Sequence, residues 1–177
     1  MRARRRRIEL VKSSTRDFAA AAESNLDDVH AYLVYLTGDR HVAEELTAET
    51  FARALERWRR YDPRRGSPRT WLCQLARTTA LDHFRAEERR RRRERRFALD
   101  APESVEAVFG EGLSPALEVA LARLSAAERE VVVLRVVLEL DGEGAARVLG
   151  ISTTACSTRL SRALAKLEKE VSAGVAA

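Results

Sequence analysis

Apolar side chains recur along the first half of the chain at the spacing of amphipathic helices. Residues three and four positions apart, such as Val29 and Leu33, share one helix face, which predicts a helix over 17–37. The same period predicts helices over 41–60 and over 68–96, with a loop rich in proline and glycine between them. No segment alternates apolar and polar residues as a half-buried strand does. The pattern therefore predicts an all-α fold.

The second half of the chain repeats the helical pattern in shorter segments. Ser125 and Glu128 have the spacing of a capping box, and a strongly apolar helix is predicted over 130–140. A short helix over 141–149 and a last helix over 153–171 follow, separated by a glycine turn. A short helix, a tight turn and a longer second helix are typical of a helix-turn-helix motif.

Charge and composition divide the chain into four parts. The 177 residues carry a formal net charge of +5, which is unevenly distributed. Residues 1–15 form an arginine-rich arm that we expect to be disordered, and residues 16–96 form a basic helical domain. Residues 97–115 contain four acidic residues and no Lys or Arg, which predicts a flexible acidic linker. Residues 116–172 form a second small helical domain.

Composition also excludes several classes of protein. The longest apolar run, from Val131 to Leu134, is too short to span a bilayer, so we expect a cytoplasmic protein without membrane insertion. Cys73 and Cys156 lie far apart without a CxxC pattern, and we expect no metal site and no cofactor. The sequence has no HExxH, GxSxG or phosphate-loop glycine pattern, and we predict no catalytic residues.

The last predicted helix has a polar outer face. Its apolar side includes Cys156, Leu160 and Leu164. Hydroxyl and guanidinium groups on the opposite side are suited to bind base edges in the major groove and phosphates. They belong to Ser157, Thr158, Ser161 and Arg162, flanked by Arg159 and Lys166. An ordinary helical hairpin with a solvated face fits the same spacing.

Aromatic residues and arginines are interleaved around the loop at 61–68. Bases of single-stranded nucleic acid stack on aromatic rings while guanidinium groups bind the backbone, and such a loop can hold an unstacked base. The residues are Trp58, Tyr61, Trp71, Arg57, Arg59, Arg60, Arg64, Arg65, Arg69 and Arg77. On spacing alone, Trp58 and Trp71 also fit positions in a hydrophobic core.

Two further charged segments each allow two interpretations. Glu44, Glu45 and Glu49 form an acidic helix face, which is either a solvated surface or a docking face for a basic partner. The arginine run at 89–96 can neutralise phosphates or remain solvated. Two glycines, at 142 and 144, lie inside the short predicted helix, where each costs about 1 kcal/mol relative to alanine.

Two parts of the chain resemble the two conserved regions of extracytoplasmic-function (ECF) sigma factors. The first resemblance rests on residues 36–54, LTGDRHVAEELTAETFARA, and on 71–85. The second rests on 124–135 and 146–164. A helix-turn-helix alone occurs in many regulators, whereas both regions in this order, joined by an acidic linker, are highly specific for the family.

The resemblance implies a bacterial transcription initiation factor that binds the β and β′ subunits of core RNA polymerase and promoter DNA. The first domain would melt and read the −10 element, and the second would read the −35 element. An anti-sigma factor is a common further partner in the family, although no residue here identifies one. The implied polymerase-binding residues are Asp39, Glu44, Glu45, Glu49 and Arg53. The implied −10 residues are Tyr61, Arg64, Arg65, Ser67, Arg69, Trp71, Arg77 and Arg85. The implied −35 residues are Ser157, Thr158, Arg159, Ser161, Arg162 and Lys166.

Two alternatives stay open beside this interpretation. A helix-turn-helix regulator that binds duplex DNA without polymerase is the first, and an RNA-processing enzyme, disfavoured by the missing catalytic groups, is the second. The sequence also departs from the family pattern. Ala48 stands where Gln is usual, Thr78 where Asn is common, Gly144-Ala145 where Glu-Ile is usual, and Ser157 where Lys or Arg is common.

Overall fold

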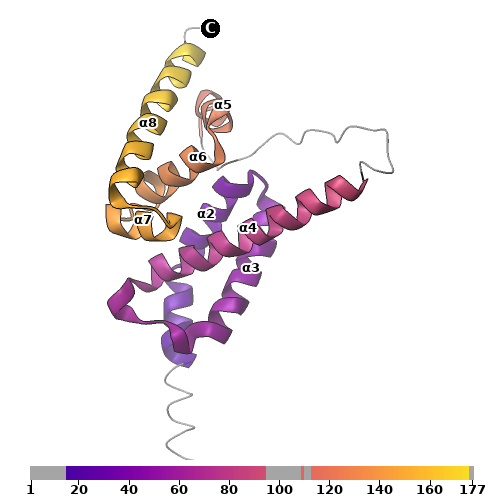
Figure 1. Cartoon of the computed structure of the whole chain (residues 1–177), viewed down its shortest axis with the longest axis vertical. Coiled ribbons are helices and arrows are strands. Elements are labelled where there is room, and N and C mark those ends of the chain that lie inside the picture. Colours follow the sequence, from indigo (N-terminus) through magenta and orange to yellow (C-terminus); the bar gives the residue numbers. More distant parts are fainter. Residues whose placement is uncertain (1–14, 95–108, 110–112, 176–177) are drawn as a thin grey trace, which may run out of the picture.

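Helices make up nearly all of the structure, a computed structural model that describes residues 15–94, 109 and 113–175. No strand occurs among these residues, which confirms the all-α fold. Figure 1 shows two groups of helices that lie against each other. The first group contains a helix over 15–23, α2 (Leu26–Thr37), α3 (Arg40–Arg57) and α4 (Pro68–Glu94). The second contains α5 (Pro115–Arg123), α6 (Ala126–Val132), α7 (Gly142–Leu149) and α8 (Thr153–Val175). Of the expected arm at 1–15, residues 1–14 lie outside the described residues, as does most of the expected linker, and Thr15 already belongs to the first helix.

The first predicted helix is two helices, separated at Ser24 and Asn25. The Ser24 hydroxyl donates to the carbonyl of Ala20 at 2.8 Å, and the Asn25 amide donates to the carbonyl of Ala21 at 2.7 Å. Short polar side chains that bind carbonyls one turn earlier compete with helix continuation. The prediction of one uninterrupted helix over 17–37 is therefore wrong at these two residues.

Local capping signals set the turn between α2 and α3. Gly38 ends α2 in the left-handed conformation, with φ of 69°, and its N–H donates to the carbonyl of Val34 at 2.8 Å. Asp39 then begins α3, because its carboxylate accepts the N–H of Val42 at 3.1 Å. This places α3 against α2, with Leu46 among the buried residues of the shared core.

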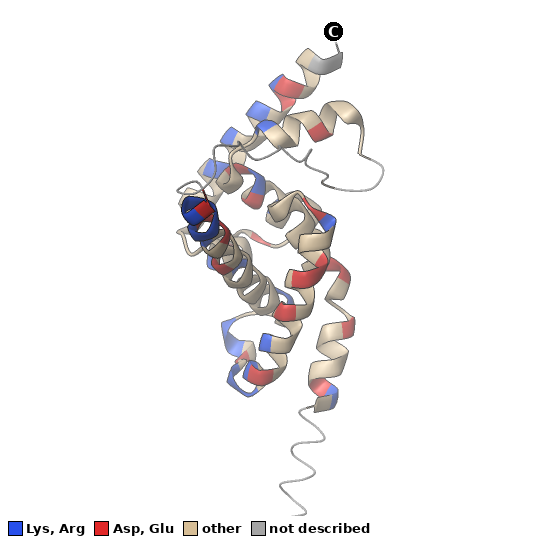
Figure 2. Ribbon diagram, turned by 90° about the vertical axis from the view of Figure 1, so that its right-hand side faces the viewer, with Lys and Arg blue, Asp and Glu red and all other residues tan. Residues whose placement is uncertain are grey.

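Two short 3₁₀ turns connect α3 to α4. They are η1 (Trp58–Arg60) and η2 (Pro63–Arg65), so the second predicted helix ends at Arg57 and not at residue 60. The hydroxyl of Ser67 accepts the N–H of Thr70 at 3.2 Å, and Pro68 is the first residue of α4, as predicted. The final turns of α4 extend past the neighbouring helices, and Figure 2 shows Lys and Arg gathered at that end.

The predicted capping box begins α6, the second helix of the second domain. The Ser125 hydroxyl accepts the N–H of Glu128, and the Glu128 carboxylate accepts the N–H of Ser125 at 2.8 Å. The apolar helix predicted over 130–140 begins earlier, at Ala126, and continues as a wider turn, η3 (Val133–Val137). There the N–H of Leu138 donates to Val133, five residues back, as in a π-helix. Asp141 caps α7 as predicted, and Gly150, with φ of 68°, ends it.

The two domains share buried surface that the sequence pattern did not predict. Helix α7 packs on α4, and α6 packs on α2. Phe109, within the segment expected to be linker, is 1% exposed and stacks on Tyr35 with 6.3 Å between ring centroids. The guanidinium of Arg129 lies 4.6 Å from the centroid of the same ring. The hydrophobic core is therefore continuous from one domain to the other.

Gly144 of α7 lies against Thr70 of α4, at the contact between the two domains. A β-carbon at this position would lie 3.3 Å from the hydroxyl oxygen of Thr70 and 3.0 Å from a carboxylate oxygen of Asp141. Both distances are shorter than ordinary van der Waals contact, so glycine lets the helices approach. A β-carbon at Gly142 would meet nothing within 4 Å, and the structure gives no reason for glycine there.

Candidate nucleic-acid interface

The outer face of α8 carries an exposed row of hydrogen-bond donors. Ser157, Thr158, Ser161 and Arg162 are all exposed, as the helical spacing predicted. On the opposite side, Cys156, Ala163 and Leu167 are buried against α5, α6 and α7. Leu164, predicted on the apolar side, is 41% exposed, so this prediction is wrong. Donors therefore line one side of a second helix whose other side is fixed by packing, as in DNA-reading helix-turn-helix motifs.

The flanking cations of α8 are partly engaged within the domain. Lys166 Nζ lies 3.2 Å from Glu128 Oε2, and Arg159 is half-buried. Hydrogen bonds from the Ser125 backbone and hydroxyl, followed by Lys166, lower the pKa of Glu128 from its ordinary value. Thr158, Arg159 and Arg162 border an open hollow of about 560 Å³ between α6 and the start of α8. Lys166 is thus held by a carboxylate, whereas Arg162 is exposed beside this hollow.

The loop at 61–68 forms a second candidate surface, in the first domain. The hydroxyl of Tyr61 donates to the carbonyl of Gly66 at 3.0 Å, and the Asp62 carboxylate accepts the N–H of Arg64 at 3.0 Å. These bonds shape a cleft of about 310 Å³. Its walls are Arg60, Tyr61, Asp62, Arg65, Gly66, Thr70, Trp71 and Gln74, with Arg147 of α7 on the far side. Arg64, Arg65 and Ser67 are exposed around it.

Trp58 and Trp71 belong to a cluster of four aromatic rings. Trp58 stacks on Tyr61 with 4.9 Å between centroids, and it meets Trp71 and Phe18 edge-on at 5.7 and 5.5 Å. Both tryptophans are half-buried. The cluster therefore packs the base of the loop, which favours a structural role for Trp58, while Trp71 and Tyr61 also reach the wall of the cleft.

The other predicted −10 arginines are paired with carboxylates. Arg69 Nε lies 2.7 Å from Asp28 Oδ2, and Arg77 Nε lies 2.7 Å from Glu130 Oε1 in the second domain. Arg85 lies 3.5 Å from Asp82 on the surface of α4. The structure does not gather these three around the loop, and Arg77 faces the other domain.

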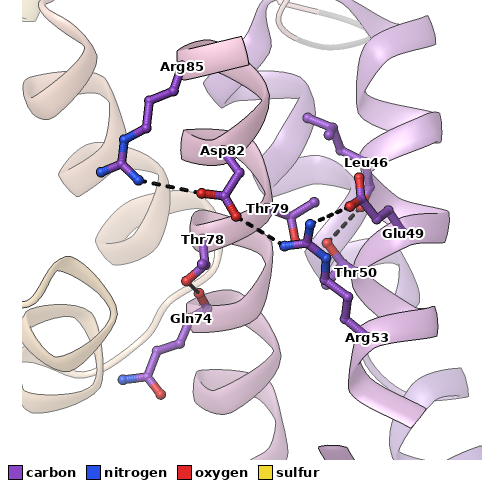
Figure 3. A network of polar contacts seen from close by, with 9 residues as sticks. All are labelled: Leu46, Glu49, Thr50, Arg53, Gln74, Thr78, Thr79, Asp82 and Arg85. Atoms are coloured by element: carbon purple, nitrogen blue, oxygen red, sulfur yellow. Dashed lines mark hydrogen bonds and ion pairs between the residues drawn. The ribbon is translucent and has the colours of Figure 1, made fainter. Parts of the chain in front are cut away.

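The predicted acidic face lies on α3, and an ion-pair network joins its end to α4. Glu44 and Glu45 are exposed, whereas Asp39 is the helix cap described above. Figure 3 shows Arg53 between Glu49, at 2.5 Å, and Asp82, at 3.3 Å, with Asp82 continuing to Arg85. The sequence analysis assigned Glu49 and Arg53 to a polymerase-binding face and Arg85 to a DNA-binding face. The structure joins them in one network through Asp82.

An apolar groove runs beside this acidic face. It has a volume of about 490 Å³ and lies between the helix at 15–23, α2 and α3. The walls are Phe18, Ala22, Leu26, His30, Thr47, Ala48 and Phe51, bordered by Glu23, Asp27 and Glu44. An apolar floor with an acidic border is complementary to an amphipathic helix that carries basic residues.

The sequence analysis did not single out three residues that form hydrogen bonds between the domains: Tyr32, Gln74 and Glu130. Tyr32 and Glu130 meet at the domain boundary, and Gln74 Nε2 donates to the carbonyl of Arg147 at 3.0 Å. The one available signal was the carboxylate of Glu130 at the start of the predicted apolar helix. A buried acid in that position requires partners that the local sequence does not supply.

The described part of the chain contains neither a cluster of metal-binding side chains nor a helix that could span a membrane. No group of three or more His, Cys, Asp or Glu residues lies close enough to hold a metal ion. No helix there is both long and apolar enough to cross a bilayer.

A helix-turn-helix with an exposed polar face, joined to a helical domain with an arginine-lined aromatic cleft, defines a two-domain protein of the nucleic-acid-binding class. Comparison with known proteins agrees. Residues 21–90 match the family model for Sigma-70 region 2, and residues 114–167 match that for Sigma-70, region 4.

The ECF RNA polymerase sigma factor SigC of Mycobacterium tuberculosis is 33% identical over 162 residues, covering 88% of this chain and 84% of that protein. BldN of Streptomyces coelicolor, also an ECF sigma factor, is 35% identical over 147 residues, covering 81% of this chain and 56% of that protein. The chain belongs to the ECF sigma factor family. It spans about half the length of BldN and of SigG, another mycobacterial relative.

The fold is also that of solved sigma factors. The sigma factor RpoE of Bartonella quintana, in a co-crystal structure with the anti-sigma factor NepR, superposes with a TM-score of 0.75. It is 22% identical, and the match covers 88% of this chain and 97% of that one.

Proposed function

We propose that this protein is a transcription initiation factor that binds core RNA polymerase and directs it to promoters. The observation that carries the proposal is the presence, in one chain, of the donor row on α8 and the aromatic–arginine cleft at 61–68. The first suits duplex DNA and the second suits unpaired bases. A promoter being opened offers both.

The second domain would read the −35 element. A helix of the length of α8 enters the major groove, where Ser, Thr and Arg side chains bind base edges or phosphates. Thr158 and Arg162, exposed beside the open hollow, support base contacts, and Ser157 and Ser161 extend the same face. Arg159 and Lys166 would contribute to phosphate binding.

The first domain would capture melted −10 DNA. Unstacking a base costs a few kcal/mol, which a pocket with aromatic walls offsets by stacking worth about 1–3 kcal/mol per base. Tyr61 and Trp71 supply such walls, and the exposed Arg64 and Arg65 supply charge for the backbone. Arg69 would contribute only after leaving Asp28. The factor would favour the open state because it binds the flipped base and the duplex does not offer one.

The groove and the acidic face of α3 would dock on the polymerase. Glu44 borders the apolar groove and Glu45, the next residue of α3, is exposed, an arrangement that supports binding of a basic amphipathic helix. Glu49 and Arg53 extend this face toward α4. By family resemblance, the partner surface is the clamp helices of core RNA polymerase.

The remaining parts of the proposal concern mode and place of action. The protein would act by binding alone and would supply no catalytic group. A factor that works on RNA polymerase acts where the polymerase does, in the cytoplasm. Since the related RpoE is bound by an anti-sigma factor, a protein of that class is a further proposed partner.

Run-off transcription tests the function. Purified protein, bacterial core polymerase and fragmented genomic DNA should give transcripts with defined start sites, which the core enzyme alone does not give. Upstream of the mapped starts, two conserved elements should appear at constant spacing. If the protein neither co-elutes with core polymerase nor produces start-specific transcripts while binding duplex DNA by itself, the regulator that acts without polymerase is the better description.

A further inference from the structure

The last turns of α4 contain no buried side chain. The last buried residue of this helix is Ala80, although the helix continues to Glu94. Ion pairs between side chains one turn apart stabilise these turns in place of a core. They join Glu87 to Arg90 at 2.8 Å, Glu88 to Arg92 at 2.7 Å, and Arg90 to Glu94 at 3.7 Å. The helix therefore stays regular where it extends past its neighbours (Figure 1).

Two arginines of these turns have no carboxylate partner. Arg89 and Arg93 are exposed, and no Asp or Glu among the described residues lies within ion-pair distance of either. The two are four residues apart and so share one face of the helix. Arg85, four residues earlier, lies on the same face, and its partner Asp82 lies 3.5 Å away at the surface. We refer to Arg85, Arg89 and Arg93 as the arginine row.

The arginine row continues the face of α4 that lines the cleft at 61–68. Trp71 forms a wall of that cleft, and Arg89 follows it by 18 residues, which is five full turns of an α-helix. The two side chains therefore leave the helix on the same side. Because α4 is one helix from Pro68 to Glu94, a rise of 1.5 Å per residue places Arg89 about 27 Å and Arg93 about 33 Å beyond Trp71.

This spacing matches duplex DNA. At 3.4 Å per base pair, the row lies about 8 to 10 base pairs from a base held at the cleft, which is close to one turn of the duplex. After one turn, the backbone of the duplex again faces the same side of α4. The C-terminal end of α4 also leads into the segment that joins the proposed −35-binding domain. The row therefore lies on the upstream side, where the promoter remains paired.

We propose that the arginine row binds the phosphate backbone of the promoter duplex about one turn upstream of the melted segment, whatever the base sequence there. The inference rests on the function proposed above and adds a third DNA contact, between the two elements. Exposed guanidinium groups bind phosphates with release of counterions and without readout of bases. The match to the Sigma-70 region 2 model ends at residue 90, so Arg93 lies beyond it.

The test measures DNA binding by the full chain without polymerase. Fluorescence anisotropy compares two labelled probes, each with an unpaired strand of about 8 nucleotides attached to a duplex of about 4 or about 16 base pairs. The short duplex ends before the row, and the long duplex passes it. For Arg89→Gln/Arg93→Gln on the long probe, the plot of log affinity against log salt should be shallower than that of wild type by about 1.8, since each phosphate contact contributes about 0.9. On the short probe the two proteins should agree, and a different duplex sequence should change neither result.

Arg91→Gln is the matched control. Arg91 is exposed in the same turns, and its substitution removes the same charge, but it follows Trp71 by 20 residues and so lies on nearly the opposite side of α4. The salt dependence of this variant should equal that of wild type on both probes. Glutamine has a helix propensity close to that of arginine, so circular dichroism should show an intact helix. If the double variant loses helix, Arg93→Gln alone decides, with an expected change of about 0.9 on the long probe.

Four results would overturn the proposal. They are a double variant with the wild-type salt dependence on the long probe, equal weakening on both probes, an equally large change for Arg91→Gln, and no binding of the long probe by wild type at low salt. The outcome is separable from that of the proposed function, because run-off transcription tests that function with polymerase. Start-specific transcripts with unchanged salt dependence would leave the function standing and remove the arginine row. The reverse result would leave the row as a duplex-binding surface and remove the function.

Discussion

The guanidinium of Arg53 on α3 lies 3.3 Å from the carboxylate of Asp82 on α4. The same guanidinium lies 2.5 Å from Glu49 and donates to the hydroxyl of Thr79 at 3.5 Å. It therefore joins the helix proposed to face the polymerase to the helix proposed to face DNA. A side chain in this position stabilises the angle between the two surfaces.

Replacement of Arg53 by methionine should lower the free energy of unfolding by about 1 kcal/mol. The side chains are 29% and 47% exposed, so solvent weakens the Arg53–Asp82 pair, but three contacts are lost together. Urea denaturation measures the effect, and Arg57→Met, exposed at the end of α3, is the control. Equal stability of the two variants would show that the network contributes nothing.

Glu45→Arg should weaken binding to core polymerase about tenfold or more while the fold stays intact. The change places a positive charge in the centre of the proposed acidic docking face, where like charges would repel. Surface-immobilised core enzyme gives the affinity, and circular dichroism gives the fold. Glu94→Arg makes the same charge change at the end of α4 and should bind as wild type does. Unchanged holoenzyme assembly by Glu45→Arg would count against this face.

Arg162→Ala should reduce transcription from promoters with an intact −35 element about tenfold, since one good base contact contributes about 1–3 kcal/mol of discrimination. The residue is exposed on the outer face of α8. Lys169→Ala, exposed one to two turns later on the same helix, is the matched control. Equal loss on promoters with a scrambled −35 element would mean that Arg162 binds phosphate and reads no sequence.

Trp71→Leu should reduce open complexes more than it reduces binding to duplex promoter. The ring lies at the cleft wall and also packs on Trp58, so some loss of stability, about 1–2 kcal/mol, is expected as well. Permanganate reactivity of unpaired thymines reports opening, and a gel-shift assay reports duplex binding. A parallel fall in both, in proportion to the unfolded fraction, would assign Trp71 to the core alone.

Stability should fall as the pH rises above about 10, and Tyr32 should account for part of the fall. Burial, followed by the charge of Glu130 and the hydrogen bond to it, raises the pKa of Tyr32 well above its ordinary value of 10.0. The unfolded chain then loses this proton at a lower pH than the folded chain, so the stabilisation is complete below pH 10 and declines above it. Denaturation measured at pH 9 to 11 should show a smaller decline in the free energy of unfolding for Tyr32→Phe than for wild type. Equal declines in the two proteins would contradict a raised pKa of Tyr32.

Local signals predicted the helix boundaries where short-range hydrogen bonds decide them. Ser67 before Pro68, the Ser125–Glu128 box and Asp141 all cap the helices that the sequence assigned to them. The helix break at Ser24 and Asn25 was not predicted because neither residue interrupts the apolar period. The break depends on hydrogen bonds of their side chains to backbone carbonyls one turn earlier.

The donor row on α8 followed from helical spacing, whereas the contact of Glu130 with Tyr32 and Arg77 did not. Tyr32 and Glu130 are 98 residues apart in the sequence, and no periodicity encodes which surfaces of two domains will meet. Tyr32 resembled an ordinary core residue, and Arg77 resembled a free cation for DNA. Pairing of these groups depends on tertiary packing, which a pattern along one chain does not contain.

The missing side chain at Gly144 has a consequence for how such a protein can change over time. Its α-hydrogen faces Thr70 where a β-carbon would lie at 3.3 Å. Any larger residue there would press on Thr70, which lines the cleft at 61–68, and on Asp141, which caps α7. Selection at this codon therefore acts through the fit between two helices, α7 and α4, that belong to different domains.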